Sequence, residues 1–340
     1  MEHCDAVVVG GGIIGLACAF RAQQRGLDVV VVDRGLPGAG ATAAAAGVLA
    51  PDPETPGFTA LARRSAELWP QFADELGDVG YTRCGSLVLF FGPKPDDLPP
   101  DDLPPGEAVD AAACRALEPG IAGDCSGGLL LADDAQVDPR RVAWALAARL
   151  GDAVRAGADV VALSPHGVEL ADGTRIGAES VVLAAGAWSA RRLAKRLAVH
   201  PVKGQTVRLR GPAPATRIIR SEHVYVVPRA NGETVVGATV EDAGWDDAAT
   251  REATELLLAR AARAVPAVAA LELVEETASL RPGTPDGGPL IGEWEGLLVA
   301  CGHYRNGILL APVTADAIAA LLVGETPPPE TTAFDPQRFD

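Results

Sequence analysis

At residues 5–15 the chain reads DAVVVGGGIIG, and this stretch decides its fold. A short run rich in valine ends in three glycines, and residues 13–25 follow with alanines at helical spacing. A second apolar run, residues 27–33, ends in Asp33. Strand, glycine turn, helix and strand form a βαβ unit, which by its handedness and burial belongs to a parallel, doubly wound sheet. We therefore expect an α/β fold with a Rossmann-like domain at its N-terminus.

The glycines of this stretch follow the spacing G-x-G-x-x-G, from Gly10 through Gly12 to Gly15. In such a motif the first glycine permits a tight turn, the second lets the backbone approach a pyrophosphate, and the third packs helix against strand. The helix N-terminus attracts the phosphate charge, and we expect Asp33 to hold ribose hydroxyls. The motif predicts a bound dinucleotide, FAD or NAD. A glycine turn that binds no nucleotide is the structural alternative.

Composition narrows the class of protein and its partners. A chain of 340 residues exceeds what one hydrophobic core usually serves, so two domains are expected. The net charge of -16 argues against a nucleic acid or an anionic membrane as partner and favours a small-molecule substrate. The six cysteines lack metal-type or disulfide-type spacing, and no apolar run is long enough to span a bilayer. We expect a soluble, cytoplasmic protein without a metal site.

The patterns further along the chain predict that the two domains interleave. Residues 201–240 read as strand, turn and strand, which suggests an antiparallel sheet, and residues 297–322 return to strand, glycine turn and alanine-rich helix. We expect the doubly wound domain over 1–80, 132–200 and 283–340, and an α+β substrate domain built on the antiparallel sheet over 81–131 and 201–282. The other expected elements are helices over 60–76, 138–150, 246–264 and 308–322, strands over 85–91, 160–163, 168–170, 180–185, 224–228 and 234–238, and a solvated loop over 92–107.

Six short motifs outside the glycine turn point to one cofactor. They are Thr42-Ala-Ala-Ala-Ala-Gly47-Val48, Val181-Val-Leu-Ala-Ala-Gly186-Ala-Trp188-Ser189, Pro201-Val-Lys-Gly204, His223-Val-Tyr225-Val-Val-Pro228-Arg229, Leu280-Arg281-Pro-Gly-Thr284 and Gly302-His-Tyr-Arg305-Asn-Gly307. In this order, over nearly the whole chain, they resemble the FAD-dependent D-amino-acid oxidase and glycine oxidase family, and within it the bacterial glycine oxidases. The resemblance implies FAD as the cofactor. We expect it to be bound non-covalently, because no cysteine lies near Arg281 as a point of attachment and Cys301 falls within a strand.

The resemblance also implies which residues contact the cofactor. Ile13 and Ile14 would lie at the pyrophosphate turn, Asp33 and Arg34 beside adenosine, and Val160 at the adenine end. Residues 303–309 would surround the isoalloxazine ring. Five residues would line the stretch from phosphate to flavin: Ala41, Thr42, Ala46, Gly47 and Val48. The expected cofactor contacts are Gly10, Gly12, Ile13, Ile14, Gly15, Asp33, Arg34, Ala41, Thr42, Ala46, Gly47, Val48, Val160, Gly186, His303, Tyr304, Arg305, Asn306, Gly307, Ile308 and Leu309.

The same resemblance places Arg281, Arg305 and Tyr225 at the substrate. Hydride transfer to a flavin needs the protein mainly to orient the substrate, and the planar fork of arginine binds both oxygens of a carboxylate. The alternatives are a structural Arg281 paired with an acid and a Tyr225 that only fills the sheet core. His223 is expected on the strand face of Tyr225, where it either reaches the pocket or stays half-exposed without a role.

Residues 305–307 are expected to open a helix whose positive end faces the flavin and stabilises its anionic reduced form. The alternative is an ordinary glycine-rich turn between strand and helix. No general base is expected, because the substrate amine can lose its proton to solvent.

We expect oxidation of glycine or a similarly small amino acid or amine to an imine, with O2 reduced to H2O2 and the imine hydrolysed to an oxo acid and ammonia. The resemblance implies a role in forming the thiazole of thiamine, and a homo-oligomer, by analogy a tetramer. The alternatives are a D-amino-acid dehydrogenase that passes electrons to a carrier and a flavoprotein subunit without turnover. The sequence leaves glycine, sarcosine, D-alanine and D-proline open as substrates.

Overall fold

A computed structural model describes residues 2–51, 57–92 and 106–340 of the protein. Its helices are α1 Ile13–Gln24, α2 Ala41–Ala44, α3 Phe58–Leu76, α4 Ala111–Leu117, α5 Pro139–Leu150, α6 Arg251–Ala264 and α7 Ala311–Leu322. Its strands are β1 Glu2–Val9, β2 Val29–Asp33, β3 Val48–Leu49, β4 Ser86–Phe90, β5 Glu107–Asp110, β6 Gly127–Leu131, β7 Ala135–Gln136, β8 Val154–Ala156, β9 Val160–Ser164, β10 Gly167–Leu170, β11 Arg175–Leu183, β12 His200–Arg210, β13 Ile218–Ser221, β14 Val224–Pro228, β15 Glu233–Gly237, β16 Glu272–Gly283, β17 Leu290–Trp294 and β18 Leu297–Cys301.

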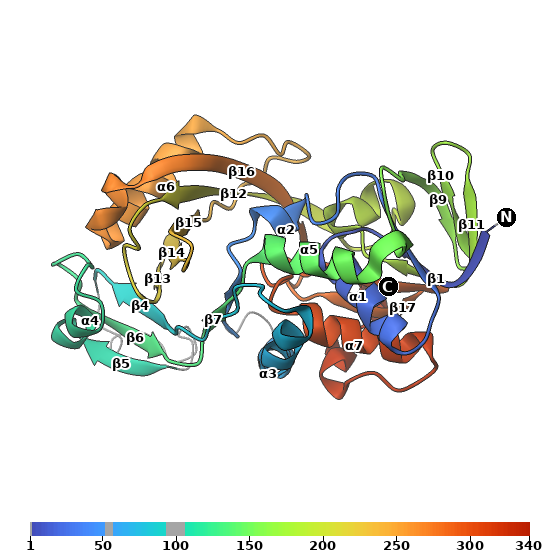
Figure 1. The fold of residues 1–340 in the computed structure, drawn as a ribbon, viewed down its shortest axis with the longest axis horizontal. Coiled ribbons are helices and arrows are strands. Elements are labelled where there is room, and N and C mark those ends of the chain that lie inside the picture. The colour runs from blue at the N-terminus through green and yellow to red at the C-terminus, as the bar shows by residue number, and fades with distance from the viewer. Residues whose placement is uncertain (1, 52–56, 93–105) are drawn as a thin grey trace.

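The first sheet has the strand order β17-β18-β11-β1-β2-β8, and its central strands are parallel. Ala6 and Val8 pack into a core with α1, α3, α5 and α7, while Val7 and Val9 face a second core on the other side. Because both faces are buried, β1 is an uninterrupted apolar run. Hairpin β9–β10 and the stretch Ser189–Leu193 contribute to the second core. Figure 1 shows helices α1, α3, α5 and α7 gathered beside this sheet.

The second sheet has the order β16-β12-β15-β14-β13-β4-β6-β5 and is antiparallel except for the pair β13 and β4. Helix α6 packs on one face of it through Leu257 and Ala261. The long strands β12 and β16 run from this sheet toward the first (Figure 1). The α/β fold with an interleaved antiparallel sheet is therefore as expected, and we keep the residue ranges given above as proposed domain limits.

The helix expected over 138–150 is α5, and Asp138 caps it, since its carboxylate accepts from the N–H groups of Arg140 and Arg141. The helix expected from residue 246 begins at Arg251 instead, because the Thr250 side chain accepts from the N–H of Ala253 and caps it there. Residues 93–105 of the expected loop over 92–107 lie outside the described residues, and Glu107 already belongs to β5.

Other features bear on partners and ligands. Within the described ranges, no helix combines the length and apolar character needed to cross a bilayer. The same residues contain no group of three or more His, Cys, Asp or Glu side chains placed to hold a metal ion. All six cysteines are free thiols.

Candidate active site

A cavity of about 1160 Å³ lies where the two sheets meet. At one end it is lined by the carboxyl ends of β1, β2 and β11, and at the other by β14, β16 and the turn after β18. Ligands of open α/β sheets bind outside the carboxyl ends of the strands, so this position suits a dinucleotide. Because the cavity extends as far as β14 and β16, it also has room for a second, smaller molecule beside these strands.

The turn between β1 and α1 requires glycine at two places. Gly10 has φ +115°, and a Cβ there would lie 2.4 Å from the carbonyl oxygen of Ala184. A Cβ on Gly15 would lie 1.9 Å from the carbonyl oxygen of Gly10, so Gly15 packs α1 against the turn and does not line the cavity. Gly12 lines the cavity. Side chains at Gly10 and Gly15 would collide with the neighbouring backbone, so glycine keeps the turn tight and its backbone open to a ligand.

The start of α1 can accept an anion. Its N-cap residue is Gly12, which has no side chain that could accept from the first N–H groups of the helix. The N–H of Ile13, the first helical residue, donates to Thr42 Oγ1 at 3.0 Å. Asp33 accepts from the N–H of Gly11 at 2.6 Å and from the N–H of Gly35 at 2.7 Å. A carboxylate has about four acceptor positions, so Asp33 keeps acceptor capacity for ribose hydroxyls.

Most of the residues expected at the cofactor line this cavity. Three do not: Gly15, Asn306 and Leu309. The Leu309 carbonyl instead accepts from Ser65 Oγ at 2.7 Å and Trp69 Nε1 at 2.9 Å, which ties the turn to α3. The residues that do line it are Gly10, Gly12, Ile13, Ile14, Asp33, Arg34, Ala41, Thr42, Ala46, Gly47, Val48, Val160, Gly186, His303, Tyr304, Arg305, Gly307 and Ile308.

The turn after β18 differs from the expectation that residues 305–307 open a helix. Helix α7 begins at Ala311, and residues 303–310 form tight turns in which the N–H of Leu310 donates to the Asn306 carbonyl at 2.8 Å. Tyr304 has φ +47°, in the left-handed region, and its N–H donates to the carbonyl of Pro282 at 2.9 Å. This bond holds the turn against β16, and a left-handed tyrosine is a strained conformation that surrounding contacts must maintain.

His303 is fully enclosed, and its Nε2 lies 3.0 Å from Thr314 Oγ1. Burial lowers the pKa of His303 from its ordinary 6.5 to about 3. The ring is therefore neutral in the folded protein near neutral pH, and it lines the cavity without carrying a charge.

Lowering the pH should destabilise the protein partly through His303. Below pH 6.5 the unfolded chain protonates this histidine while the folded protein does not until about pH 3, so stability is lost as the pH falls through that window. We expect His303→Gln to reduce the decline of the unfolding free energy between pH 7 and pH 5, by up to about 1.4 kcal/mol per pH unit. Urea unfolding at saturating FAD, repeated at several pH values, measures the unfolding free energy. If it fell equally with pH in the variant and the wild type, His303 would not have the lowered pKa described above.

Arg281 lies on β16 and faces the cavity without a carboxylate partner among the described residues. Its Nη1 donates to the carbonyl oxygens of Thr239, at 3.0 Å, and Lys203, at 3.3 Å. The alternative that Arg281 is a structural arginine paired with an acid therefore does not describe this site. Burial lowers the pKa of Arg281, which stays a cation because the ordinary value is so high. Its remaining N–H groups are available to an anionic ligand.

Two glycines in the second sheet, Gly204 and Gly237, make room for the side chains of Arg281 and Tyr225. A Cβ on Gly204 would lie 2.1 Å from the guanidinium of Arg281, and one on Gly237 would lie 2.5 Å from the hydroxyl oxygen of Tyr225. Glycine inside a strand often marks such a close approach. That signal was present in the sequence, since both glycines lie in stretches that read as strands.

Tyr225 lies on β14, is half-buried, and has Arg281 and Arg305 as charged neighbours. Burial raises the pKa of Tyr225 above its ordinary 10, although the two arginines oppose this effect. The phenol is therefore protonated near neutral pH and can donate a hydrogen bond into the cavity, which it lines. The guanidinium of Arg305 lies 5.5 Å from the ring centroid of Tyr304.

His223 does not share a strand face with Tyr225, so this expectation was wrong. Ser221 pairs with Val224 in the β13–β14 hairpin, which leaves His223 in the two-residue turn between the strands. Its side chain is exposed and lies 3.5 Å from Glu222, at the rim of the cavity. The period-of-two argument failed because the strand begins one residue after His223.

Two tryptophans meet where the domains join. The rings of Trp188 and Trp245, the latter from the loop between β15 and α6, have centroids 4.9 Å apart. The guanidinium of Arg34 lies 3.8 Å from the Trp188 ring centroid, and that of Arg191 lies 4.4 Å from the Trp245 ring centroid. Trp188 and Arg34 also line the cavity. This cation–π stack joins the two domains beside the cavity.

The profile of a family described as FAD dependent oxidoreductase matches residues 5–321. The chain belongs to this family. FAD dependence and the family, both expected from the motifs, are confirmed.

Relatives of this FAD-dependent oxidoreductase carry two kinds of name. The Bifunctional protein ThiO/ThiG of a Synechocystis species is 37% identical over 98% of this chain and 54% of its own length. The glycine oxidase of Geobacillus kaustophilus is 34% identical over 98% of this chain and 96% of its own. The crystal structure of glycine oxidase from Geobacillus kaustophilus superimposes with a TM-score of 0.91 at 31% identity over 98% of both chains. The chain thus spans about half the length of the bifunctional relatives that it matches.

The cavity suits the FAD of this family. The glycine turn, the start of α1 and Asp33 would hold the pyrophosphate and ribose, and residues 41–48 would line the way to the flavin. Burial raises the pKa of the Cys301 thiol to about 12, and the side chain packs in a hydrophobic core. A protonated, buried thiol is a poor nucleophile, which supports non-covalent binding.

Proposed function

We propose that the protein oxidises glycine, or another small amino acid or amine, to an imine at the expense of O2, which becomes H2O2. The observation that carries this proposal is Arg281, a partly buried cation that faces the cofactor cavity and, among the described residues, donates only to backbone carbonyls. Such a guanidinium matches a substrate carboxylate. The similarity to glycine oxidases over nearly the full length of both chains supports the same substrate class.

The residues of this chain would act by binding and orientation. Arg281 would hold the substrate carboxylate through its free N–H groups, and the protonated phenol of Tyr225 would donate to the same group. Arg305 supplies a second cation beside Tyr225. When bound, FAD supplies the hydride acceptor, and fixing the substrate Cα–H against it removes much of the entropic cost of the reaction. The imine product then hydrolyses to an oxo acid and ammonia.

An anaerobic absorbance titration with glycine tests the proposal. We expect glycine to bleach the oxidised flavin, and admission of air to restore the colour with formation of peroxide. Bleaching followed by slow re-oxidation would instead identify a dehydrogenase that uses a carrier. If glycine, sarcosine, D-alanine and D-proline all left the colour unchanged, the substrate proposal would be wrong and a flavoprotein subunit without turnover would be favoured.

Gly204→Ala should impair substrate binding without impairing FAD binding. The new methyl group would lie 2.1 Å from the guanidinium of Arg281 and must displace it. We expect the KM for glycine in an oxygen-consumption assay to rise at least about tenfold, equivalent to about 1.4 kcal/mol. Gly123→Ala is the control, because a Cβ there meets nothing within 4 Å. An unchanged KM in Gly204→Ala would contradict the position given to Arg281.

We further propose the wider context implied by the resemblance: a cytoplasmic homo-oligomer, by analogy a tetramer, whose imine product supplies the thiazole of thiamine. Light scattering on the purified holoenzyme tests the oligomeric state. A mass equal to that of one chain would contradict it.

A further inference from the structure

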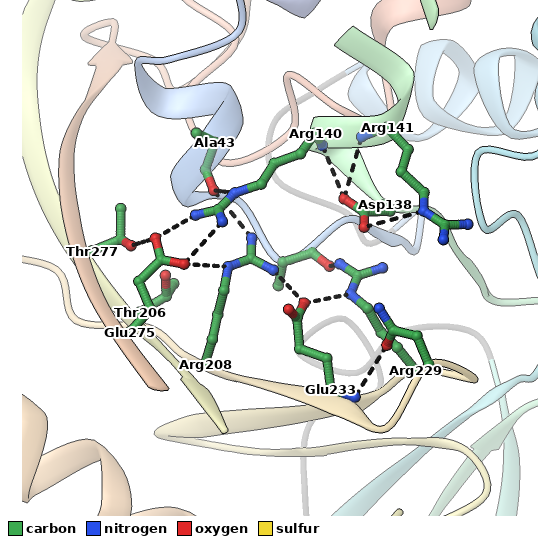
Figure 2. A network of polar contacts seen from close by, with 12 residues as sticks. Ala43, Asp138, Arg140, Arg141, Thr206, Arg208, Arg229, Glu233, Glu275 and Thr277 are labelled. Carbon is green, nitrogen blue, oxygen red and sulfur yellow. Dashed lines mark hydrogen bonds and ion pairs between the residues drawn. The ribbon is translucent and has the colours of Figure 1, made fainter. Parts of the chain in front are cut away.

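Three arginines gather behind the cofactor-lining segment, residues 41–48 (Figure 2). Arg140 comes from α5, Arg208 from β12, and Arg229 follows β14. The side chains of Arg208 and Arg229 are 2% and 5% exposed. They converge on the side of the segment that faces away from the cavity, and they come from both halves of the fold.

Each arginine donates to a backbone carbonyl of the segment. The Ala43 oxygen accepts from Arg140 Nε at 3.1 Å and from Arg208 Nη2 at 3.1 Å. The Ala46 oxygen accepts from Arg229 Nη2 at 2.8 Å. In addition, the Ala44 oxygen accepts from Thr206 Oγ1 at 2.9 Å. Three carbonyls are therefore drawn to one side, away from the ligand.

Residues 41–48 need these contacts because their own backbone hydrogen bonds are too few to keep the segment in this conformation. Helix α2 has four residues, ATAA, and lacks a capping side chain at its start. The last carbonyls of any helix have no partner within it, and a helix this short is not stable alone. Alanine side chains offer no hydrogen bonds. The guanidinium groups thus satisfy carbonyls that would otherwise be buried without partners.

Two carboxylates fix the arginines. Glu275 binds Arg140 through two bonds, of 2.9 and 2.5 Å, and lies 3.7 Å from Arg208 Nε. Glu233 binds Arg208 Nη1 at 2.5 Å and lies 3.5 Å from Arg229 Nε. The hydrogen bond from Arg140 lowers the pKa of Glu275 to about 2, so this carboxylate is ionised near neutral pH. These contacts with Glu275 and Glu233 fix the orientation of the three guanidinium groups.

The cluster shares its strands with the substrate anchor. Arg208 and Gly204 both lie on β12, and Glu275 and Arg281 both lie on β16, which pairs with β12 over its full length. A shift of the segment relative to β12 would break the bonds to Ala43 and Ala44 at once. The contacts therefore tie the cofactor-lining segment to the same pair of strands that carries Arg281.

We propose that Arg208, with Arg140 and Arg229, positions FAD: these side chains bind the carbonyl groups of residues 43–46 from behind and so hold the segment against the cofactor in register with Arg281. Arg208 is a positioning residue, since it does not line the cavity itself. The proposal rests on the FAD dependence of the family and is independent of the substrate.

Arg208→Lys tests the proposal. Lysine keeps the charge but lacks the planar guanidinium, in which one nitrogen donates to Glu233 and another to the Ala43 carbonyl. We expect the Kd of the variant for FAD to be at least tenfold higher than that of the wild type. Titrating the apoprotein with FAD measures it. Amide hydrogen exchange should be faster in residues 41–48 but not in the rest of the first sheet. The visible circular dichroism of bound FAD should change as well.

Arg217→Lys is the matched control. Arg217 also donates to one carbonyl, of Leu117, and to one carboxylate, of Glu118, but it lies outside the cavity and the segment. Its Kd for FAD should stay within twofold of the wild-type value. If Arg208→Lys does not fold, Arg140→Lys removes a donor to the same Ala43 carbonyl from a more exposed side chain. An unchanged Kd, or faster exchange spread evenly over the protein, would overturn the proposal.

Discussion

Replacing Arg281 with alanine is expected to weaken glycine binding by about 30-fold or more while the protein still binds FAD. Removing one partner of a buried, hydrogen-bonded charge pair costs about 2 to 5 kcal/mol. Arg281 is a partly buried cation that faces the cavity and, among the described residues, donates only to the carbonyls of Thr239 and Lys203. Anaerobic titration of the flavin absorbance with glycine measures the loss.

The conservative variant Arg281→Lys serves as the control for charge. Lysine restores a cation but not the planar fork, so we expect it to recover only part of the affinity. Because Gly204 lies against the guanidinium, a lysine would also leave an unfilled space there. Normal glycine turnover by Arg281→Ala would show that another group anchors the carboxylate.

Gly10→Ala is expected to abolish FAD binding. The Cβ would lie 2.4 Å from the carbonyl oxygen of Ala184, and φ at Gly10 is +115°, where a side chain is strained even in open space. The turn would have to move away from the carboxyl end of β11, and with it the start of α1. The purified variant should be colourless, and the ratio of flavin to protein absorbance measures this.

Gly26→Ala separates the clash from the backbone strain. Gly26 also has a positive φ, +84°, but a Cβ there meets nothing within 4 Å. We expect this variant to lose about 1 kcal/mol of stability and to keep its FAD. A yellow Gly10→Ala protein with the wild-type flavin content would mean that the turn does not lie against the cofactor.

Both predictions concern the same cavity from opposite ends. In the proposed arrangement the glycine turn holds the cofactor and Arg281 holds the substrate, so Gly10→Ala should remove colour and activity together. Arg281→Ala should remove activity from a protein that stays yellow. The contrast between the two variants distinguishes the cofactor site from the substrate site.

The sequence by itself determined the βαβ unit, the family and the cofactor. The βαβ unit follows from local features: a valine run, glycines at fixed spacing and an acid at the end of the next strand. The family and FAD follow from the resemblance that six further motifs along the chain carry. A turn such as that at Gly10 admits only glycine because backbone sterics forbid a Cβ there, and such a constraint is visible in the sequence. The cap at Asp138 is local in the same sense.

The ends of two elements depended on contacts that the residue pattern did not show. His223 lies in a turn because Ser221 pairs with Val224, a register that the alternation of residues did not reveal. Helix α7 starts at Ala311 because the preceding turn is tied to α3 and to β16. Neither contact has a signal in the local sequence.

The tertiary structure alone decided what surrounds the functional side chains. Arg281 rests on Gly204 because β12 and β16 pair in a register that places them diagonally across the sheet. Arg140 and Arg208 meet at the Ala43 carbonyl from elements far apart in the chain. A residue type and its spacing show which local conformations are allowed, whereas the partners of a buried charge are set by how the two sheets pack together.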